Sequence, residues 1–349
     1  MSHLRSGSFG RGESVGHITV GLVGCGGWGA RLALGVNRRP GLRLVAAADH
    51  RSDRASRLAQ QVGALRVYGD ASELIADSAI EAVFIATPIA SHYAITRAAL
   101  TAGKHVWVEK PLCTSSDEAQ ELVDLAARHR RMLMVDHTML FSAAAQAMRG
   151  LLHSREFARR TLYDAVRAGP GWALQEQSVL WDLASHDLAI MDFLLGEAPI
   201  DAEASAVTDT ATGRQMAVSA TLRFASGMIA QLRASWAEPI RMRRTLVVAA
   251  RRAVLWDELV PERPLRLFDI PETDEAMVGN VMPVERPVPA VDNGEPLAGA
   301  LDNFAAAIAG RARLLADGAQ GVRVVRALDM IQRALARADL NDRASVRRH

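Results

Sequence analysis

The feature that most constrains the fold is the glycine-rich segment GLVGCGGWGA, residues 21–30, directly after the apolar run 18–23. A strand, a glycine turn and a helix in this order are typical of the first unit of a dinucleotide-binding fold. The first glycine permits a tight turn, the second lets a pyrophosphate approach, and the third allows close helix–strand contact. These positions are Gly24, Gly26 and Gly29. We expect phosphates at the N-terminus of the following helix, 28–37.

Short apolar strands alternate with amphipathic helices through the first half of the chain. Strands are predicted at residues 18–23, 42–48, 65–68, 82–86, 106–108 and 132–135, and helices at residues 28–37, 52–62, 71–75 and 91–101, with another beginning after Ser115. Ser115 and Glu118 have the spacing of a capping box. Parallel neighbours need crossover connections, so this pattern predicts a doubly wound parallel sheet. We assign residues 17–139 to a Rossmann dinucleotide-binding domain.

Asp49 follows the predicted strand 42–48 and stands twenty residues after Gly29. A carboxylate at this place binds the ribose hydroxyls of NAD, and its charge would repel the additional phosphate of NADP. His50 and Arg51 follow directly and could serve that phosphate, or could lie in a solvated loop. We therefore expect NAD, without excluding NADP. The alternative to a cofactor site is a structural turn beside an exposed acid.

After about residue 140 longer alternating runs appear. Runs 215–224 and 228–236 predict one hairpin with a single buried face, and 245–248 with 253–256 predict another. The proline-rich segment 260–296 is expected to form loops, followed by helices at 297–309 and 321–336. The expected fold class is thus α/β: the Rossmann domain plus an α+β domain, residues 140–349, with a largely antiparallel sheet for substrate binding and oligomerisation.

Composition argues against several classes of function. The chain has 349 residues, of which 49% are hydrophobic, and a formal net charge of only +2. Nothing global attracts nucleic acid or an anionic membrane, and no apolar run is long enough to cross a bilayer. Cys25 and Cys113 lack metal-type spacing, so we expect no metal and a reducing, cytoplasmic location. Residues 1–16 lack the apolar core of a secretory signal and are interpreted as a mobile tail.

Two further motifs follow predicted strands: Thr87-Pro88 with His92, and the tripeptide Glu109-Lys110-Pro111. With the glycine turn they resemble the Gfo/Idh/MocA oxidoreductase family, named for glucose–fructose oxidoreductase and inositol dehydrogenase, from residue 18 to about residue 336. The resemblance implies that both motifs line the nicotinamide site. The expected cofactor-binding residues are Gly24, Gly26, Gly27, Trp28, Gly29, Asp49, His50, Arg51, Thr87, Pro88, His92, Glu109 and Lys110.

Lys110 can also be interpreted without the family. It follows a strand at the carboxyl edge of the sheet, where open sheets bind ligands. Partly desolvated, its ammonium could hydrogen-bond a substrate hydroxyl and stabilise a developing alkoxide. The alternative is a surface lysine paired with Glu109, a residue that we expect to brace the turn. A cis bond is possible before Pro111.

The second half contributes Asp182 and His186, which lie four residues apart and would share one face of a helix. Histidine is suited to accept a hydroxyl proton near neutral pH, and Asp182 can orient it or hold a substrate hydroxyl. In isolation such residues usually form a surface pair. Their match to the family's D-x-x-x-H motif implies that His186 is the catalytic base or acid, with Asp182 and Lys110 as its partners.

One position departs from part of the family. Sugar and inositol dehydrogenases often carry an additional Asp three residues after the histidine, where this chain has Ala189. Asp187, directly after His186, must point elsewhere. The WDLxxHD form resembles members that act on nucleotide-linked or biosynthetic sugars, so the substrate is left open.

Other residues are candidates for binding the substrate. His137 lies near the expected domain junction, and Arg167 ends a predicted strand where it could meet an acidic or phosphorylated substrate. A packing or solvated role is the alternative for both. For the basic group Arg241, Arg243 and Arg244 we expect a solvated face.

These patterns predict an enzyme that transfers hydride between NAD(P) and a secondary hydroxyl or ketone of a sugar or nucleotide-linked sugar. One alternative is a redox-neutral isomerase or glycoside-cleaving enzyme with tightly bound, transiently reduced NAD. Another is a non-catalytic dinucleotide-binding protein, which would have no reason to retain Lys110, Asp182 and His186 together. The resemblance implies a homodimer or homotetramer, and the one-faced sheet also suggests self-association.

Overall fold

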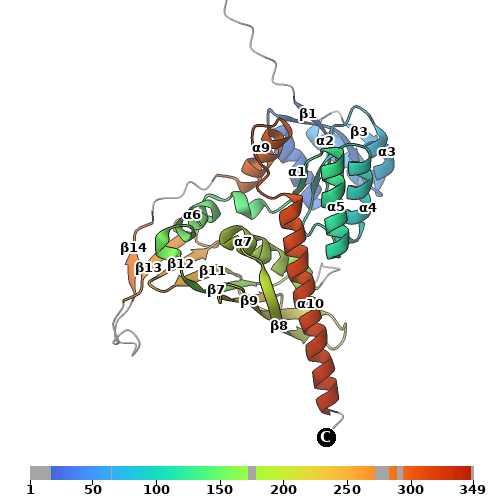
Figure 1. The fold of residues 1–349 in the computed structure, drawn as a ribbon. Helices are drawn as coiled ribbons and strands as arrows, with labels where there is room; N and C mark the ends of the chain where they lie inside the picture. Colours follow the sequence, from blue (N-terminus) through green and yellow to red (C-terminus); the bar gives the residue numbers. More distant parts are fainter. Residues whose placement is uncertain (1–16, 64, 172–177, 272–282, 289–293, 347–349) are drawn as a thin grey trace, which may run out of the picture.

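The computed structural model describes residues 17–63, 65–171, 178–271, 283–288 and 294–346. The segment expected to be a mobile tail, residues 1–16, lies outside these ranges. Within them the chain forms two sheets with associated helices, and Figure 1 shows the smaller sheet above the larger one. None of the helices in the described ranges is long and apolar enough to cross a membrane.

The first sheet is parallel and has the order β3-β2-β1-β4-β5-β6. This is the usual Rossmann order, and the prediction of a doubly wound parallel sheet is confirmed. Its strands are β1 (Ile18–Val23), β2 (Leu42–Ala48), β3 (Arg66–Tyr68), β4 (Ala82–Ile85), β5 (His105–Val108) and β6 (Leu133–Val135). Its helices are α1 (Gly27–Asn37), α2 (Ser52–Val62), α3 (Ala71–Ala76), α4 (His92–Thr101) and α5 (Ser116–His129). The predicted cap of α5 is present, because Ser115 Oγ accepts the N–H of Glu118.

The glycine turn joins β1 to α1 and needs glycine at two of its positions. Gly24 has a φ of +94°, and a Cβ there would collide with the carbonyl oxygen of Ala86. A Cβ on Gly29 would collide with the carbonyl oxygen of Gly24. Both residues are therefore required for the close contact between α1, the turn and the loop after β4.

The second sheet has eight strands in the order β14-β13-β12-β11-β7-β10-β9-β8. Their bounds are β7 (Arg160–Ala168), β8 (Pro199–Thr208), β9 (Gln215–Phe224), β10 (Ile229–Ser235), β11 (Met242–Ala249), β12 (Arg252–Asp257), β13 (Leu265–Asp269) and β14 (Val284–Arg286). Both predicted hairpins, β9–β10 and β11–β12, are present. One pair departs from the antiparallel pattern, because β7 and β10 run parallel in the middle of the sheet. Pairing between strands so distant in sequence leaves no local signal.

The expectation of loops throughout residues 260–296 was wrong. In this proline-rich segment β13 alternates buried Leu265 and Leu267 with less buried residues and pairs with β12. Strand β14 then pairs with β13 at the edge of the sheet. Prolines flank these short strands without interrupting their ladders, which is the position that proline tolerates near a sheet edge. Parts of the segment lie outside the described residues.

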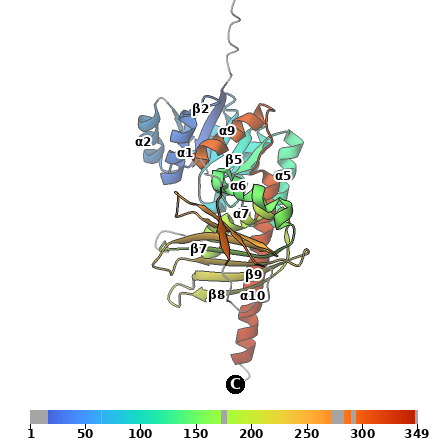
Figure 2. The ribbon, with the colours of Figure 1, turned by 90° about the vertical axis from the view of Figure 1, so that its left-hand side faces the viewer.

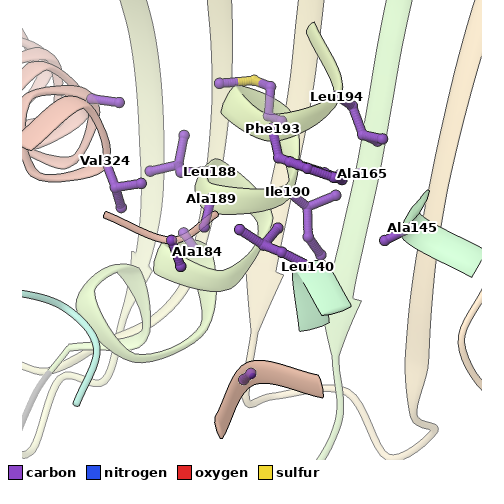
Figure 3. Packing of buried hydrophobic residues seen from close by; sticks show 14 of the residues in the cluster. Leu140, Ala145, Ala165, Ala184, Leu188, Ala189, Ile190, Phe193, Leu194 and Val324 are labelled. Atoms are coloured by element: carbon purple, nitrogen blue, oxygen red, sulfur yellow. The ribbon is translucent and has the colours of Figure 1, made fainter. Parts of the chain in front are cut away.

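Helix α7 (Ser185–Leu195) forms the centre of the core above the second sheet, together with α6 (Ala143–Leu152). Figure 3 shows Leu188, Ile190 and Leu194 of α7 among Leu140, Ala165 and Val324 from other elements. Nearly every residue of α7 is buried, so this helix is anchored on several sides. A π-helical turn, Leu180–Ala184, precedes it directly. The segment that contains Asp182 and His186 is thus held rigidly between the two sheets.

The last two helices are α9 (Pro296–Ile308) and α10 (Gly318–Val346), and α9 returns to the first sheet rather than the second. Phe304 of α9 packs edge-on against Phe84 and Trp107 of strands β4 and β5. Figures 1 and 2 both show α9 beside α1 and α10 running from the first sheet past the second. The chain after residue 140 therefore contributes to both units, which differs from the simple division expected at residue 139.

Candidate active site

A cavity of about 760 Å³ lies beside the glycine turn, at the carboxyl ends of β1 and β4. These neighbouring strands mark the point where the strand order reverses, which is the binding crevice of open parallel sheets. The predicted residues that line it are Gly24, Gly26, Gly27, Trp28, Asp49, His50, Thr87 and Pro88. A Cβ on Gly26 or Gly27 would meet nothing within 4 Å, so both leave room for a ligand at the start of α1. The cavity thus fits a dinucleotide in chemistry and position.

Asp49 is 6% exposed and stands on the wall of this cavity. Its two carboxylate oxygens each accept a backbone N–H, from Cys25 and from Arg51, at 2.8 Å. The carboxylate is therefore fixed in place by the glycine turn and by the start of α2. Each oxygen retains a free lone pair, as binding of a ribose hydroxyl requires.

The cations near Asp49 differ from the expectation in one respect. His50 lines the cavity, and its Nδ1 lies 3.3 Å from Asp49 Oδ1. Arg51 is not among the lining residues, and its guanidinium pairs with Asp53 at 3.4 Å. Arg54, one helical turn further, lines the cavity instead. Its position five residues after Asp49, in the first turn of α2, was a signal that the sequence interpretation missed.

His92 has a supporting position rather than a place on the cavity wall. It is 1% exposed, and its ring nitrogens lie 2.9 Å from the carbonyl oxygen of Pro111 and 2.8 Å from that of Thr87. Burial lowers the pKa of this histidine. The ring thus joins the two motif loops, and the peptide bond between Lys110 and Pro111 is cis.

Lys110 from the first half of the chain meets Asp182 from the second. The ammonium Nζ donates to the carbonyl oxygen of Asp182 at 2.9 Å and lies 3.2 Å from Oδ1 of its carboxylate. The two side chains are only 15% and 18% exposed. The ammonium is therefore mostly buried and pairs with Asp182 from the other half of the chain rather than with Glu109.

His186 lies in the first turn of α7, four residues after Asp182. The intervening turn is π-helical rather than α-helical, so the predicted common face on one regular helix is only approximate. Burial lowers the pKa of His186 well below its usual value, and the charges of Lys110 and Arg167 lower it further. Both effects favour the neutral form of the imidazole, which has a nitrogen lone pair.

His137 lies close to the same group of cations. It is 3% exposed, and neither of its ring nitrogens has a hydrogen-bond partner among the described residues. Burial, with a contribution from the charge of Lys110, lowers the pKa of His137 to about 3. A buried ring with both nitrogens unpaired is available to a ligand, since buried polar atoms are normally hydrogen-bonded.

Beneath Lys110, Glu109 and Asp136 bring two buried carboxyl oxygens together. Neither Glu109 Oε1 nor Asp136 Oδ1 meets a donor from another described residue. Asp136 Oδ2 accepts Trp28 Nε1–H at 3.0 Å, and Glu109 Oε2 accepts the backbone N–H of Lys110 at 3.3 Å. Burial first, and the charge of Asp136 second, raise the pKa of Glu109 well above its usual value. Burial therefore favours the protonated form of these carboxyl groups, and the hydrogen bond from the Lys110 N–H places Glu109 against the lysine turn.

For Arg167 the two alternatives were contact with an acidic or phosphorylated substrate and a packing role, and the structure gives it buried ion pairs. It is 5% exposed, its Nε lies 3.1 Å from both carboxylate oxygens of Asp187, and its Nη2 lies 2.5 Å from Glu258 Oε1. The guanidinium is therefore neutralised by two carboxylates inside the protein. Asp187 points away from the direction of His186 and into this cluster, as its position in the motif required.

The expected solvated face of Arg241, Arg243 and Arg244 is confirmed, because Arg241 and Arg244 are exposed and the Arg243 side chain is 43% exposed. Arg244 pairs with Asp257 at 2.7 Å. Arg241 and Arg243 also line a second cavity, of about 110 Å³, together with Asp182. This cavity, called the arginine cavity below, is separate from the dinucleotide cavity and adjoins the partner of Lys110.

The chain is similar to known proteins both in sequence and in fold. Residues 18–137 match the model of the GFO_IDH_MocA oxidoreductase family, described as an NAD-binding Rossmann fold, and residues 155–255 match the C-terminal domain of the same family. A 1,5-anhydro-D-fructose reductase of Ensifer adhaerens is 30% identical over 225 residues, which cover 60% of this chain and 67% of the relative.

A second relative matches over most of both chains. The UDP-N-acetylglucosamine 3-dehydrogenase of Acidithiobacillus ferrooxidans is 25% identical over 317 residues, 89% of this chain and 95% of the relative. A solved structure of this enzyme superimposes with a TM-score of 0.80 and covers 91% of this chain and 98% of its own. The similarity therefore includes both sheets and the segments that carry the candidate active site.

Proposed function

Because this chain belongs to the Gfo/Idh/MocA oxidoreductase family, we propose that it oxidises a secondary hydroxyl of a sugar or nucleotide-linked sugar, or reduces the corresponding ketone, with NAD. The observation that carries the proposal is the contact between Lys110 Nζ and Asp182, 3.2 Å from the carboxylate, with His186 four residues further on at the start of α7. An ammonium and a proton acceptor beside a nicotinamide fold are what oxidation of a hydroxyl needs.

Each candidate residue has a separate task in this proposal. The nicotinamide, when bound, accepts or supplies the hydride. Lys110 donates a hydrogen bond to the substrate oxygen and stabilises its negative charge. Asp182 holds that ammonium in position, and His186 takes the hydroxyl proton in the oxidative direction and returns it in the reverse direction. His137, with both ring nitrogens unpaired, is a further contact for a substrate hydroxyl.

NAD is favoured over NADP by the position of Asp49. Its carboxylate stands on the cavity wall and is fixed by two backbone donors, so a 2′-phosphate at this place would meet an immobile negative charge. His50 and Arg54 line the same cavity and are the cations available to the alternative. The substrate class is supported by the relative that matches over most of its length, which is named for a nucleotide-linked sugar.

The test is a panel of sugars, sugar nucleotides and polyols with NAD and with NADP, followed by the absorbance of the reduced nicotinamide. We expect turnover with NAD on at least one member. Lys110→Met and His186→Ala should each lower kcat by about 10²–10⁴-fold while dinucleotide binding survives. His129→Ala, on the exposed end of α5, is the matched histidine control. Normal turnover by either site variant would remove that residue from the mechanism.

A further inference from the structure

The arginine cavity has a charge pattern that the proposed reaction does not require. Three arginines and one carboxylate line its 110 Å³: Arg167, Arg241, Arg243 and Asp182. Transfer of a hydride and a proton uses only Lys110, Asp182 and His186. The question is therefore which of these arginines is free to bind a ligand.

Arg167 is not free, because Asp187 and Glu258 neutralise it within the protein. It acts as a support: it holds Glu258, whose second oxygen lies 4.0 Å from Arg243 Nη1. Asp182 is likewise committed to Lys110. Both carboxylates near the cavity wall are thus already paired with other cations.

Arg243 and Arg241 remain incompletely compensated. Among the described residues Arg243 has only the long contact with Glu258, and burial, followed by the charge of Arg167, lowers the pKa of its guanidinium. Arg241 forms no ion pair or hydrogen bond with the residues that the structure describes. Arg243 in β11 and Arg241, which directly precedes this strand, both line the cavity, while Arg244 does not line it and pairs with Asp257.

Arg241 lies close to the backbone that follows β7. Gly169 follows β7, and a Cβ on it would lie 2.9 Å from Arg241 Cγ. The pairing of β7 with β11 places Arg243 directly opposite Arg167. Two guanidinium groups therefore lie on a wall that the sheet register defines, beside the carboxylate that holds Lys110.

We propose that the substrate carries an oxyanion, a carboxylate or a phosphate, and that Arg241 and Arg243 bind it while the reacting hydroxyl lies at Lys110 and His186. This inference rests on the proposed function and specifies the substrate class of the same site. Guanidinium groups bind carboxylate and phosphate oxygens in a forked geometry, which gives orientation as well as affinity. The oxyanion would complete the charge balance of the cavity and fix which hydroxyl reaches Lys110.

The experiment compares sugars that differ mainly in an anionic group. The probes are D-galacturonate against D-galactose for the carboxylate, and D-glucose 6-phosphate against D-glucose, with UDP-glucose added, for the phosphate. Binding of each probe to the NAD-saturated protein is measured by calorimetry, and kcat/KM is measured wherever turnover occurs. The variants are Arg241→Gln and Arg243→Gln, with Arg244→Gln as the matched control on the opposite face of the same strand.

We expect the wild type to bind at least one anionic probe about tenfold or more tightly than its neutral counterpart, as one additional charge-assisted hydrogen bond provides. This preference should fall by about tenfold in Arg241→Gln and Arg243→Gln, mainly through KM where turnover is measured, and persist in Arg244→Gln. A preference for D-galacturonate over D-galactose would identify the bound group as a carboxylate, and a preference for D-glucose 6-phosphate over D-glucose would identify it as a phosphate.

Two outcomes would overturn the inference: equal binding of anionic and neutral probes in both arms, or an unchanged preference in both cavity variants. The binding ratio decides this whether or not any probe is turned over. Absence of turnover on the complete panel of sugars, with both nicotinamide cofactors, would count against the proposed function instead.

Discussion

The dinucleotide cavity and the arginine cavity are lined by different kinds of chemical groups. The first is lined largely by backbone and small residues of one glycine turn and the loops next to it, with Asp49 as its fixed charge. The second is lined by long charged side chains from β7, the π-helical turn and the start of β11. A cofactor site can thus be a local property of the chain, whereas the proposed substrate site depends on register and on ion pairs between distant segments.

The largest expected effect comes from removing a buried ion pair beside the arginine cavity. Arg167→Met would leave Asp187 and Glu258 buried without their shared cation. We expect the free energy of unfolding to fall by about 3–5 kcal/mol, the usual result of removing one partner from a buried ion pair. Urea denaturation followed by circular dichroism measures it, with the exposed Arg244→Met as control. A loss as small as that of the control would mean that the cluster does not support the sheet.

An intermediate effect is expected from changes in the glycine turn beside the dinucleotide cavity. Two glycines three residues apart, Gly26 and Gly29, should respond differently. Gly29→Ala places a methyl group against the Gly24 carbonyl and should cost about 1–3 kcal/mol of stability. Gly26 has an ordinary extended conformation, with φ −71° and ψ −169°, and open space around it. Gly26→Ala should therefore leave stability within about 0.5 kcal/mol.

The same variant should weaken dinucleotide binding, because its methyl group enters the cavity. We expect the Kd for NAD to rise by about tenfold in Gly26→Ala. Fluorescence titration measures the Kd, and thermal unfolding without cofactor measures the stability of both variants. Wild-type NAD affinity in Gly26→Ala would remove this turn from the cofactor site.

Near pH 6, where the unfolded chain only begins to bind the proton, the smallest expected effect concerns His137, which lies near Lys110. Its pKa is about 3 in the folded protein against 6.5 for an unburied histidine, so it stays unprotonated where the unfolded chain binds a proton. Stability from this residue is therefore complete above pH 6.5 and decreases as the pH falls towards 3. The slope is about 1.4 kcal/mol per pH unit.

His137→Gln should remove that slope, whereas the exposed His129→Gln should not. Glu109 and Asp136 have raised pKa values and act in the opposite sense, because they favour the folded state as the pH falls. The informative quantity is thus the difference between variant and wild type in urea denaturation at several pH values. Parallel pH dependences for the two proteins would show that His137 is not buried in its neutral form.

The first unit was largely predictable because its signals are local. The order of strand, glycine turn and helix, repeated with helical crossovers, predicted the parallel sheet, and Asp49 follows its strand on the cavity wall. Element ends mostly differed by one or two residues. Of the second sheet, two hairpins and the strand that ends at Arg167 were predicted, and β13 was missed because prolines on both sides hid its two buried leucines.

The site shows the same division. The two catalytic motifs were visible as short patterns, but the contact of Lys110 with Asp182 joins residues 72 positions apart. The sequence spacing could not show whether Arg167 or Arg243 is the better candidate for binding a substrate. Arg167 is paired with carboxylates that lie 20 and 91 positions away in the chain. Arg54 was overlooked, although its place in the first turn of α2 was available.

Local order in the chain was enough to establish the fold class, the nicotinamide cleft and the names of the catalytic candidates. Periodicity and glycine spacing are short-range properties, and backbone sterics translate them directly into strands, turns and helices. Which cation is free and which is already paired was settled by the packing of β7, α7 and β11. Electrostatic pairing depends on distance in space rather than on position along the chain, so charge compensation emerged only when the sheets had been assembled.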